Sequence, residues 1–168
     1  MRTNEEILRE RAAQIARENS ADNKVVDELH LVGFLLYPEK YAIETAYVRE
    51  VLATKEITPL PGTPAYMIGI LHLKGSVVSV IDLKTLFGLK EIGLTGTNKL
   101  ILLKNDHMEF ALLVDEVTGL SSIDEDKIAG PPLTLSSRAA EFIKGLTPSG
   151  TIVLDAARML DSKWLIVN

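Results

Sequence analysis

The chain has 168 residues, an apolar content of 46%, a charged content of 24% and a formal net charge of −5. This length suits one compact domain or two small subdomains with a common core, and no apolar run approaches the ~20 residues that span a bilayer. The negative charge argues against a nucleic-acid partner, because affinity for nucleic acid comes mainly from neutralising phosphates. The absence of cysteine excludes disulfides, thiolate metal sites and a cysteine nucleophile.

The start of the chain predicts a helix followed by a short linker. Leu8, Ala12 and Ile15 recur at the spacing that places them on one side of a helix. This apolar stripe is thin, so we expect the helix to dock on the body of the protein or on another chain. The segment is charged and lacks the apolar core of a signal peptide, which favours a cytoplasmic protein. We therefore expect a helix and linker over residues 1–24 and one domain over residues 25–168.

Apolar runs separated by turn residues follow, and they predict antiparallel hairpins. The clearest turn is at Lys74 and Gly75, where glycine can take the positive φ of a tight hairpin turn. A second turn is expected at residues 105–107. Several of the expected strands are apolar on both faces, as in LILL and FALLV, so much of their surface should be buried between packed subdomains.

A repeated local pattern predicts two related β subdomains. Asp82 and Asp155 each follow a β-branched run directly, and each can cap the first turn of a short helix there. We expect one subdomain at about residues 29–94 and the other at about residues 97–156. Residues 164–168 would form a strand that closes one of them.

The sequence offers no constellation that requires catalysis. The three histidines lie in different expected elements, and their spacing does not place two of them on one face. Asp82, Asp106 and Asp115 could be combined with serines into a triad only by assumption, since no nucleophile elbow is present. We expect these aspartates to be turn caps and solvated charges. No phosphate-binding loop occurs either, so the sequence predicts no catalytic residue, no metal and no cofactor.

Motifs over residues 28–160 resemble those of the CheW family of chemotaxis adaptors. The stretch GILHLKGSVVSVIDL, residues 69–83, is similar to the family pattern G-[VI]-x-N-L-R-G-x-V-[IV]-P-V-[IV]-D-L. The stretch FALLVDEVTGLSSIDEDKI, residues 110–128, is similar to the family's V-D-x-V-x-x-[VI]-x-x-[IL] segment. The order and spacing of the motifs also agree with the family. The chain is therefore identified as a member of this family.

This resemblance implies a mostly β fold, with two SH3-like five-stranded β-barrels packed together, short helices and the N-terminal α-helix. It also implies a non-enzymatic scaffold in signal transduction. One surface would bind the cytoplasmic tip of a methyl-accepting chemoreceptor, and others would bind the regulatory domain of a CheA-type histidine kinase or further CheW-like adaptors. The chain would reach the membrane-associated array through these partners, without inserting into the membrane.

The resemblance also implies receptor-contacting residues in the first half of the chain. These are Val48, Val51, Gly69, Lys74 and Gly75. Core packing is the alternative role for both valines, close packing for Gly69, and a solvated turn position for Lys74. His72 and Lys74 stand where the family usually has asparagine and arginine. Lysine keeps the charge but loses the planar fork that binds a carboxylate with two hydrogen bonds.

The kinase-contacting candidates at matching positions are Leu113, Val114 and Val117, for which core packing is again the alternative. Two other functions remain open at this point. One is a CheW-like adaptor recruited to a different two-component or scaffold system, which the replacements at His72 and Lys74 allow. The other is an enzyme built on a small β-barrel, which a deep polar pocket with a strongly perturbed ionisable group would favour.

Overall fold

A computed structural model of the chain describes residues 28–89, 97–131 and 138–166, together with Asn4. Apart from Asn4, the expected N-terminal helix and linker lie outside the described residues. Within the described part of the chain, none of the helices combines the length and the apolar character needed to cross a membrane.

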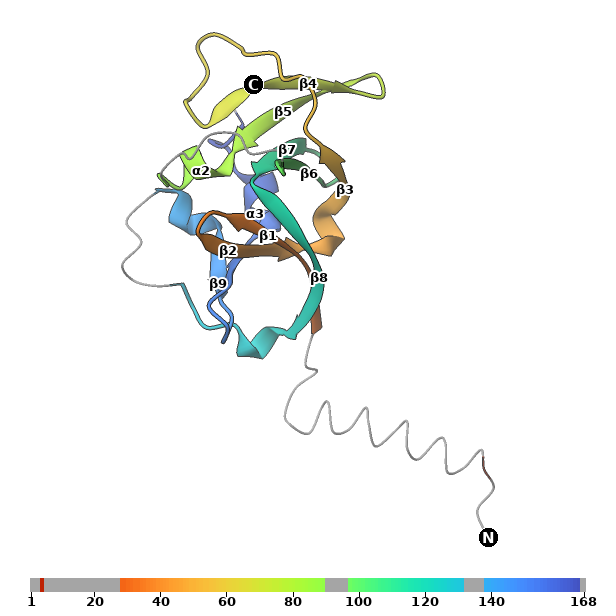
Figure 1. Cartoon of the computed structure of the whole chain (residues 1–168), viewed down its shortest axis with the longest axis vertical. Helices are drawn as coiled ribbons and strands as arrows, with labels where there is room; N and C mark the ends of the chain where they lie inside the picture. The colour runs from red at the N-terminus through yellow and green to blue at the C-terminus, as the bar shows by residue number, and fades with distance from the viewer. Residues whose placement is uncertain (1–3, 5–27, 90–96, 132–137, 167–168) are drawn as a thin grey trace.

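The described strands form two five-stranded sheets (Figure 1). Sheet A has the order β8-β1-β2-β10-β9 and comprises β1 Glu28–Leu36, β2 Glu39–Glu44, β8 Glu116–Asp124, β9 Ile143–Leu146 and β10 Ile152–Leu154. Sheet B has the order β3-β6-β7-β5-β4 and comprises β3 Val48–Ala53, β4 Met67–Leu73, β5 Ser76–Asp82, β6 Lys99–Lys104 and β7 Glu109–Val114. The helices are short: α2 Leu83–Leu86, α3 Ala156–Asp161, and the 3₁₀ helices η1 Thr45–Tyr47, η2 Glu125–Lys127 and η3 Arg138–Phe142. The predicted mostly β fold of two packed five-stranded units is confirmed.

The two sheets repeat one topology. Each contains a single parallel pair, β2 with β10 in sheet A and β7 with β5 in sheet B, while the other neighbours are antiparallel. In each pair one strand, β5 or β10, is followed by a helix whose first turn is capped by aspartate. Asp82 accepts a hydrogen bond from the backbone N–H of Lys84, and Asp155 accepts one from that of Arg158. Both predicted caps are confirmed.

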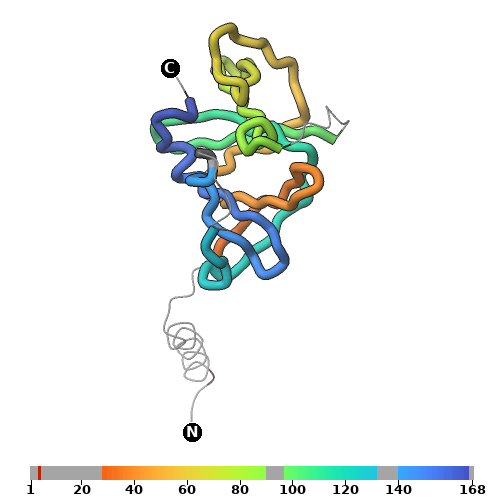
Figure 2. The backbone as a smooth tube through the Cα atoms, turned by 90° about the vertical axis from the view of Figure 1, so that its left-hand side faces the viewer, coloured from red at the N-terminus to blue at the C-terminus, as the bar shows by residue number. Residues whose placement is uncertain are grey.

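The predicted division of the chain into sequential halves is wrong. Sheet B is built from one continuous stretch, residues 48–114, whereas sheet A combines residues 28–44 with residues 116–154. In Figure 2 the orange β1–β2 hairpin lies beside the blue C-terminal strands, as the β2–β10 pairing requires. Turn motifs in a sequence identify strands that pair with their neighbours. They carry no information about pairing between strands that are more than 70 residues apart, such as β1 and β8.

The predicted closing strand at residues 164–168 is also not observed. Its described part, from Trp164 to Ile166, forms a turn and a bend. The hydroxyl group of Tyr66 donates to the carbonyl oxygens of Trp164 and Leu165, both at 2.9 Å. The Trp164 ring stacks on Phe142 with ring centroids 5.1 Å apart. This segment is therefore held by side chains, and apolar residues that suggested a strand serve to anchor a turn.

The apolar core has three parts, which explains why strands are apolar on both faces. The largest part lies between the sheets and includes Phe34 of β1, Ile101 of β6 and Phe110 of β7. The alternate residues of the same sheet B strands, Leu100 and Ala111, belong to a second cluster inside sheet B. A third, smaller cluster lies inside sheet A. Each sheet thus encloses an interior of its own and also packs against the other sheet, as the sequence predicted.

Tyr41 of β2 is a buried ionisable group in the core between the sheets. Its side chain is 4% exposed, and its ring stacks on Phe34 and Phe87 with centroid distances of 5.8 and 5.9 Å. Burial raises the pKa of Tyr41 from 10.0 to about 12, and the nearby charge of Glu39 adds to the shift. In the folded protein the phenol therefore keeps its proton at pH values where the unfolded chain has lost it.

We expect this pKa shift to make the protein less stable at high pH. The raised folded-state pKa contributes stability that is complete below pH ~10 and is lost as pH rises to about 12. The loss should be about 1–3 kcal/mol, since one pKa unit corresponds to ~1.4 kcal/mol. Urea unfolding at several pH values measures it. Tyr41→Phe should remove the loss and Tyr47→Phe should leave it, and an unchanged profile in Tyr41→Phe would contradict the assignment.

Candidate partner-binding site

The predicted receptor-contacting valines lie on β3, at one edge of sheet B. Val48 is half-buried and packs against the core between the sheets, whereas Val51 is 40% exposed. Residues 48–53 form a strand in which half-buried and exposed positions alternate. Val51 therefore leaves apolar surface accessible, while core packing accounts for most of Val48. A hollow of about 250 Å³ beside Val48 is lined by Ala46, Tyr47, Val48, Arg49, Lys104, Asn105 and Asp106.

The β4–β5 turn brings Lys74 next to β3. Lys74 and Gly75 have φ angles of 46° and 83° and form the two-residue connection between Leu73 and Ser76. Positive φ at both central positions is the geometry of a type I′ hairpin turn, which favours glycine. The Lys74 ammonium nitrogen lies 4.0 Å from a carboxylate oxygen of Glu50, and the lysine side chain is 76% exposed. Glu50 and Lys74 lie on one face of this sheet edge, and Val51, the next residue along β3, points to the other face. We call the edge formed by Glu50, Val51 and Lys74 the β3–turn surface.

Gly69 of β4 is required for close packing. A Cβ atom added there would lie 2.3 Å from the carbonyl oxygen of Thr58, and the φ angle of Gly69 is 154°. The backbones of Thr58 and Ile70 exchange two hydrogen bonds of 2.8 Å beside it. The chain segment that leads from β3 to β4 therefore lies directly on Gly69. This contact explains the glycine without any partner.

The predicted kinase-contacting residues are mostly buried. Leu113 is 7% exposed and lies inside sheet B, and Val114 is 1% exposed and lies between the sheets. Val117, at the start of β8, is half-buried and packs against the same core. Core packing therefore accounts for Leu113 and Val114, whose side chains are not presented to a partner. Of the three, only Val117 offers accessible side-chain surface.

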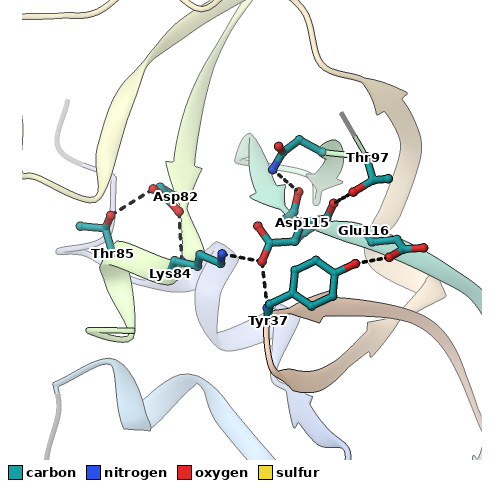
Figure 3. A network of polar contacts seen from close by, with 9 residues as sticks. Tyr37, Asp82, Lys84, Thr85, Thr97, Asp115 and Glu116 are labelled. Carbon is teal, nitrogen blue, oxygen red and sulfur yellow. Dashed lines mark hydrogen bonds and ion pairs between the residues drawn. The ribbon is translucent and has the colours of Figure 1, made fainter. Parts of the chain in front are cut away.

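A buried ion pair joins the two sheets, and the sequence did not predict it (Figure 3). The ammonium nitrogen of Lys84, at the start of α2, lies 2.6 Å from a carboxylate oxygen of Asp115, and the two side chains are 6% and 4% exposed. The same oxygen accepts a 2.8 Å hydrogen bond from the backbone N–H of Tyr37, in the β1–β2 turn. Asp115 is the residue at which the chain crosses from β7 in sheet B to β8 in sheet A. The expectation that Asp115 is a cap or a solvated charge is wrong.

Neighbouring hydrogen bonds complete this junction. The hydroxyl group of Thr97 donates to the carbonyl oxygen of Asp115 at 2.9 Å, and the side chain of Asn98 donates to the carbonyl oxygen of Val114 at 3.1 Å. The Tyr37 hydroxyl group donates to the carboxylate of Glu116, and this hydrogen bond raises the pKa of the phenol. The one sequence signal for the junction was a lysine and an aspartate, each set within an apolar run.

Among the described side chains, no group of three or more His, Asp or Glu residues is placed to hold a metal ion. The buried Lys84–Asp115 pair is enclosed in the junction, and neither residue lines the described cavities. Two features stand out, an exposed surface on sheet B and a buried polar connection between the sheets.

Comparison with known proteins gives consistent matches over most of the chain. Residues 30–163 match the family model described as the CheW-like domain. The chemotaxis protein CheW of Treponema pallidum is 27% identical over 146 residues, which cover 83% of this chain and 86% of that protein. The protein PilI of Pseudomonas aeruginosa is 23% identical over 137 residues, covering 82% of this chain and 77% of that protein. The crystal structure of the scaffolding protein TtCheW from Thermoanaerobacter tengcongensis is similar with a TM-score of 0.69 and 31% identity, covering 76% of this chain and 89% of that chain.

Proposed function

Because the chain belongs to the CheW-like domain family, we propose that it is a non-enzymatic chemotaxis adaptor that couples a chemoreceptor to a CheA-type histidine kinase. The family match over residues 30–163 supports this proposal most directly. The similarity to a scaffolding protein of known structure agrees with a role in assembly. The adaptor would act at the receptor array through its partners.

The β3–turn surface is the proposed contact for the receptor tip. Val51 supplies exposed apolar area on one face of this edge, and Lys74 and Glu50 supply charges of both signs on the other face. The hollow next to Val48 has room for a side chain of a helical partner. Gly75 holds the turn in the conformation that presents Lys74, and Gly69 allows the segment before β4 to pack directly on that strand. For the kinase, Val117 is the remaining contact candidate.

The chain would transmit a signal by holding its partners in one geometry. A receptor bound to sheet B can influence a kinase bound elsewhere only if the two sheets keep a fixed relation. The common core and the buried pair of Lys84 and Asp115 provide such a relation. A shift in the receptor would then bias the kinase between its active and inactive states, through a difference in binding free energy.

Calorimetric titration with a receptor-tip fragment and, separately, with the kinase regulatory domain tests this function. We expect dissociation constants in the micromolar range, about −8 kcal/mol. Val51→Glu should weaken receptor binding about tenfold or more, because it places a charge in an apolar contact. Lys74→Ala should weaken it less than about fivefold, since exposed ion pairs contribute ~0–1 kcal/mol.

Leu120→Ala provides the matched control for these variants. Leu120 is an exposed aliphatic residue on β8 of sheet A, 80% accessible and outside the β3–turn surface. Its truncation should leave receptor binding unchanged. If Leu120→Ala and Val51→Glu weaken binding equally, the β3–turn surface is not the contact. If the wild-type chain binds neither partner, the adaptor function itself is overturned.

A second candidate is a CheW-like adaptor that serves a different two-component or scaffold system. The similarity to PilI, a relative that carries a different name, supports this second candidate. His72 and Lys74 also support it, because the family usually has asparagine and arginine at these positions. The same titrations discriminate between the two. Binding of the kinase domain without binding of a chemoreceptor tip would favour this second function.

A further inference from the structure

The interior of sheet A is less filled than that of sheet B. Among the described residues, eight buried side chains form the cluster inside sheet B, whereas three form the cluster inside sheet A. The three are Leu31, Ala42 and Val153. Next to them lies a cavity of about 490 Å³, which is open to solvent. This open cavity offers a concave place for another segment to pack on sheet A.

The cavity combines an apolar floor with a polar rim. Its accessible apolar lining comes from the half-buried Leu35 and Ile123 and the exposed Pro148, with the buried Leu31 and Ala42 beneath them. Serine and threonine side chains of β8 and of the β9–β10 connection lie around it, together with Lys40. An occupant with a narrow apolar side and polar flanks would suit this lining, because the hydroxyl groups can stay hydrated or bind its polar groups.

The chain that precedes Glu28 ends at this cavity. Glu28 is the first residue of β1, and Leu31 follows three positions later, about 10 Å along the strand at ~3.3 Å per residue. Residues 1–27 contain one apolar stripe at helical spacing, formed by Leu8, Ala12 and Ile15, with charged residues around it. Twelve residues separate Ile15 from Glu28, and they can span up to ~40 Å. The stripe can therefore reach the cavity on its own chain.

We propose that the segment over residues 1–24 docks on sheet A of its own chain and places Leu8, Ala12 and Ile15 over this cavity. Tethering favours this occupant over a separate molecule, because a short linker gives an effective concentration in the millimolar range. The docked segment would complete the interior that sheet A leaves open. This inference does not depend on the receptor contact proposed above, since that contact lies on sheet B.

Cysteine cross-linking of the full-length chain tests this docking, because the natural sequence contains no cysteine. The test variant carries Leu8→Cys and Ser122→Cys, the second at the cavity rim. The control carries Leu8→Cys and Val77→Cys, at an exposed position on sheet B. Mild oxidation should give an intramolecular disulfide in the test variant, with a yield independent of protein concentration. Equal yields in both variants would overturn the proposal, and so would disulfide-linked dimers as the main product.

Hydrogen exchange provides a measurement without engineered cysteines. The comparison is between the wild-type chain and a variant that carries both Leu8→Glu and Ile15→Glu. Amides of residues 118–123 in β8 should exchange about ten times more slowly in the wild type, because a docked state populated about tenfold over the undocked state protects them to that extent. Amides in β4 and β5 of sheet B should be unaffected. Equal exchange of β8 in both chains would contradict docking, and equal slowing throughout the protein would indicate a general change in stability instead.

Discussion

Replacing Asp115 with leucine should lower the free energy of unfolding by about 3–5 kcal/mol, the cost typical of removing one partner of a buried ion pair. The variant leaves the ammonium group of Lys84 in a site where its side chain is 6% exposed. It also removes the oxygen that accepts from the backbone N–H of Tyr37. Urea unfolding followed by far-UV circular dichroism measures the change, with the slope of the transition as a check on two-state behaviour.

A double variant shows whether the buried charge causes this loss. Lys84→Met together with Asp115→Leu removes both charges and keeps similar volumes, so it should recover most of the stability. Glu109→Ala provides a surface control, because its partner Arg49 is 44% exposed and the pair should contribute ~0–1 kcal/mol. If Asp115→Leu cost no more than Glu109→Ala, the buried pair would have no special role in stability.

The buried pair also bears on how an adaptor can work. Asp115 marks the crossing between the sheets, Lys84 belongs to the helix that follows β5, and Tyr37 to the turn between β1 and β2. Three elements that are distant in sequence therefore meet at one carboxylate. The double variant, with stability restored, is the useful reagent for asking whether these charges also fix the angle between the sheets. Distances between spin labels on β3 and β8 would report that angle.

Much of the fold could be predicted because its signals are local. The Lys74–Gly75 turn and the caps at Asp82 and Asp155 depend only on nearby residues, and the structure contains all of them. The pairing of β1 and β2 with C-terminal strands could not be predicted in this way. Hydrophobic patterns identify strands but not their pairing partners at long sequence separation. The β1–β2 hairpin was therefore assigned to the first subdomain together with the strands that follow it.

The site shows the same division between local and distant information. The resemblance identified positions, but only the structure separates exposed Val51 from buried Leu113 and Val114. All three are aliphatic residues in strands, so the sequence alone does not indicate which of them is exposed. The pairing of Lys84 with Asp115 joins residues 31 positions apart, and no motif spacing indicates it. Burial and long-range contacts are properties of the assembled fold, and they were the missing information.

The second large effect is expected at Gly69, where alanine should lower the free energy of unfolding by about 3 kcal/mol, at the upper end of typical overpacking costs. The added Cβ would lie 2.3 Å from the carbonyl oxygen of Thr58 and 2.8 Å from its carbonyl carbon. Both are backbone atoms, held by the two hydrogen bonds between Thr58 and Ile70, so the strain cannot be relieved by rotating a side chain. Thermal and urea unfolding of Gly69→Ala measure the loss.

Gly130→Ala is the matched control, because nothing lies within 4 Å of a Cβ atom added there. Its stability should stay within about 0.5 kcal/mol of the wild type. Gly145→Ala should resemble Gly69→Ala, since its Cβ would lie 2.0 Å from the carbonyl oxygen of Ala129 at the equivalent place in sheet A. Receptor titration of Gly69→Ala under folded conditions then separates two roles. A stable variant with greatly weakened receptor binding would make Gly69 a contact residue, whereas an unstable variant that still binds when folded would confirm a packing role.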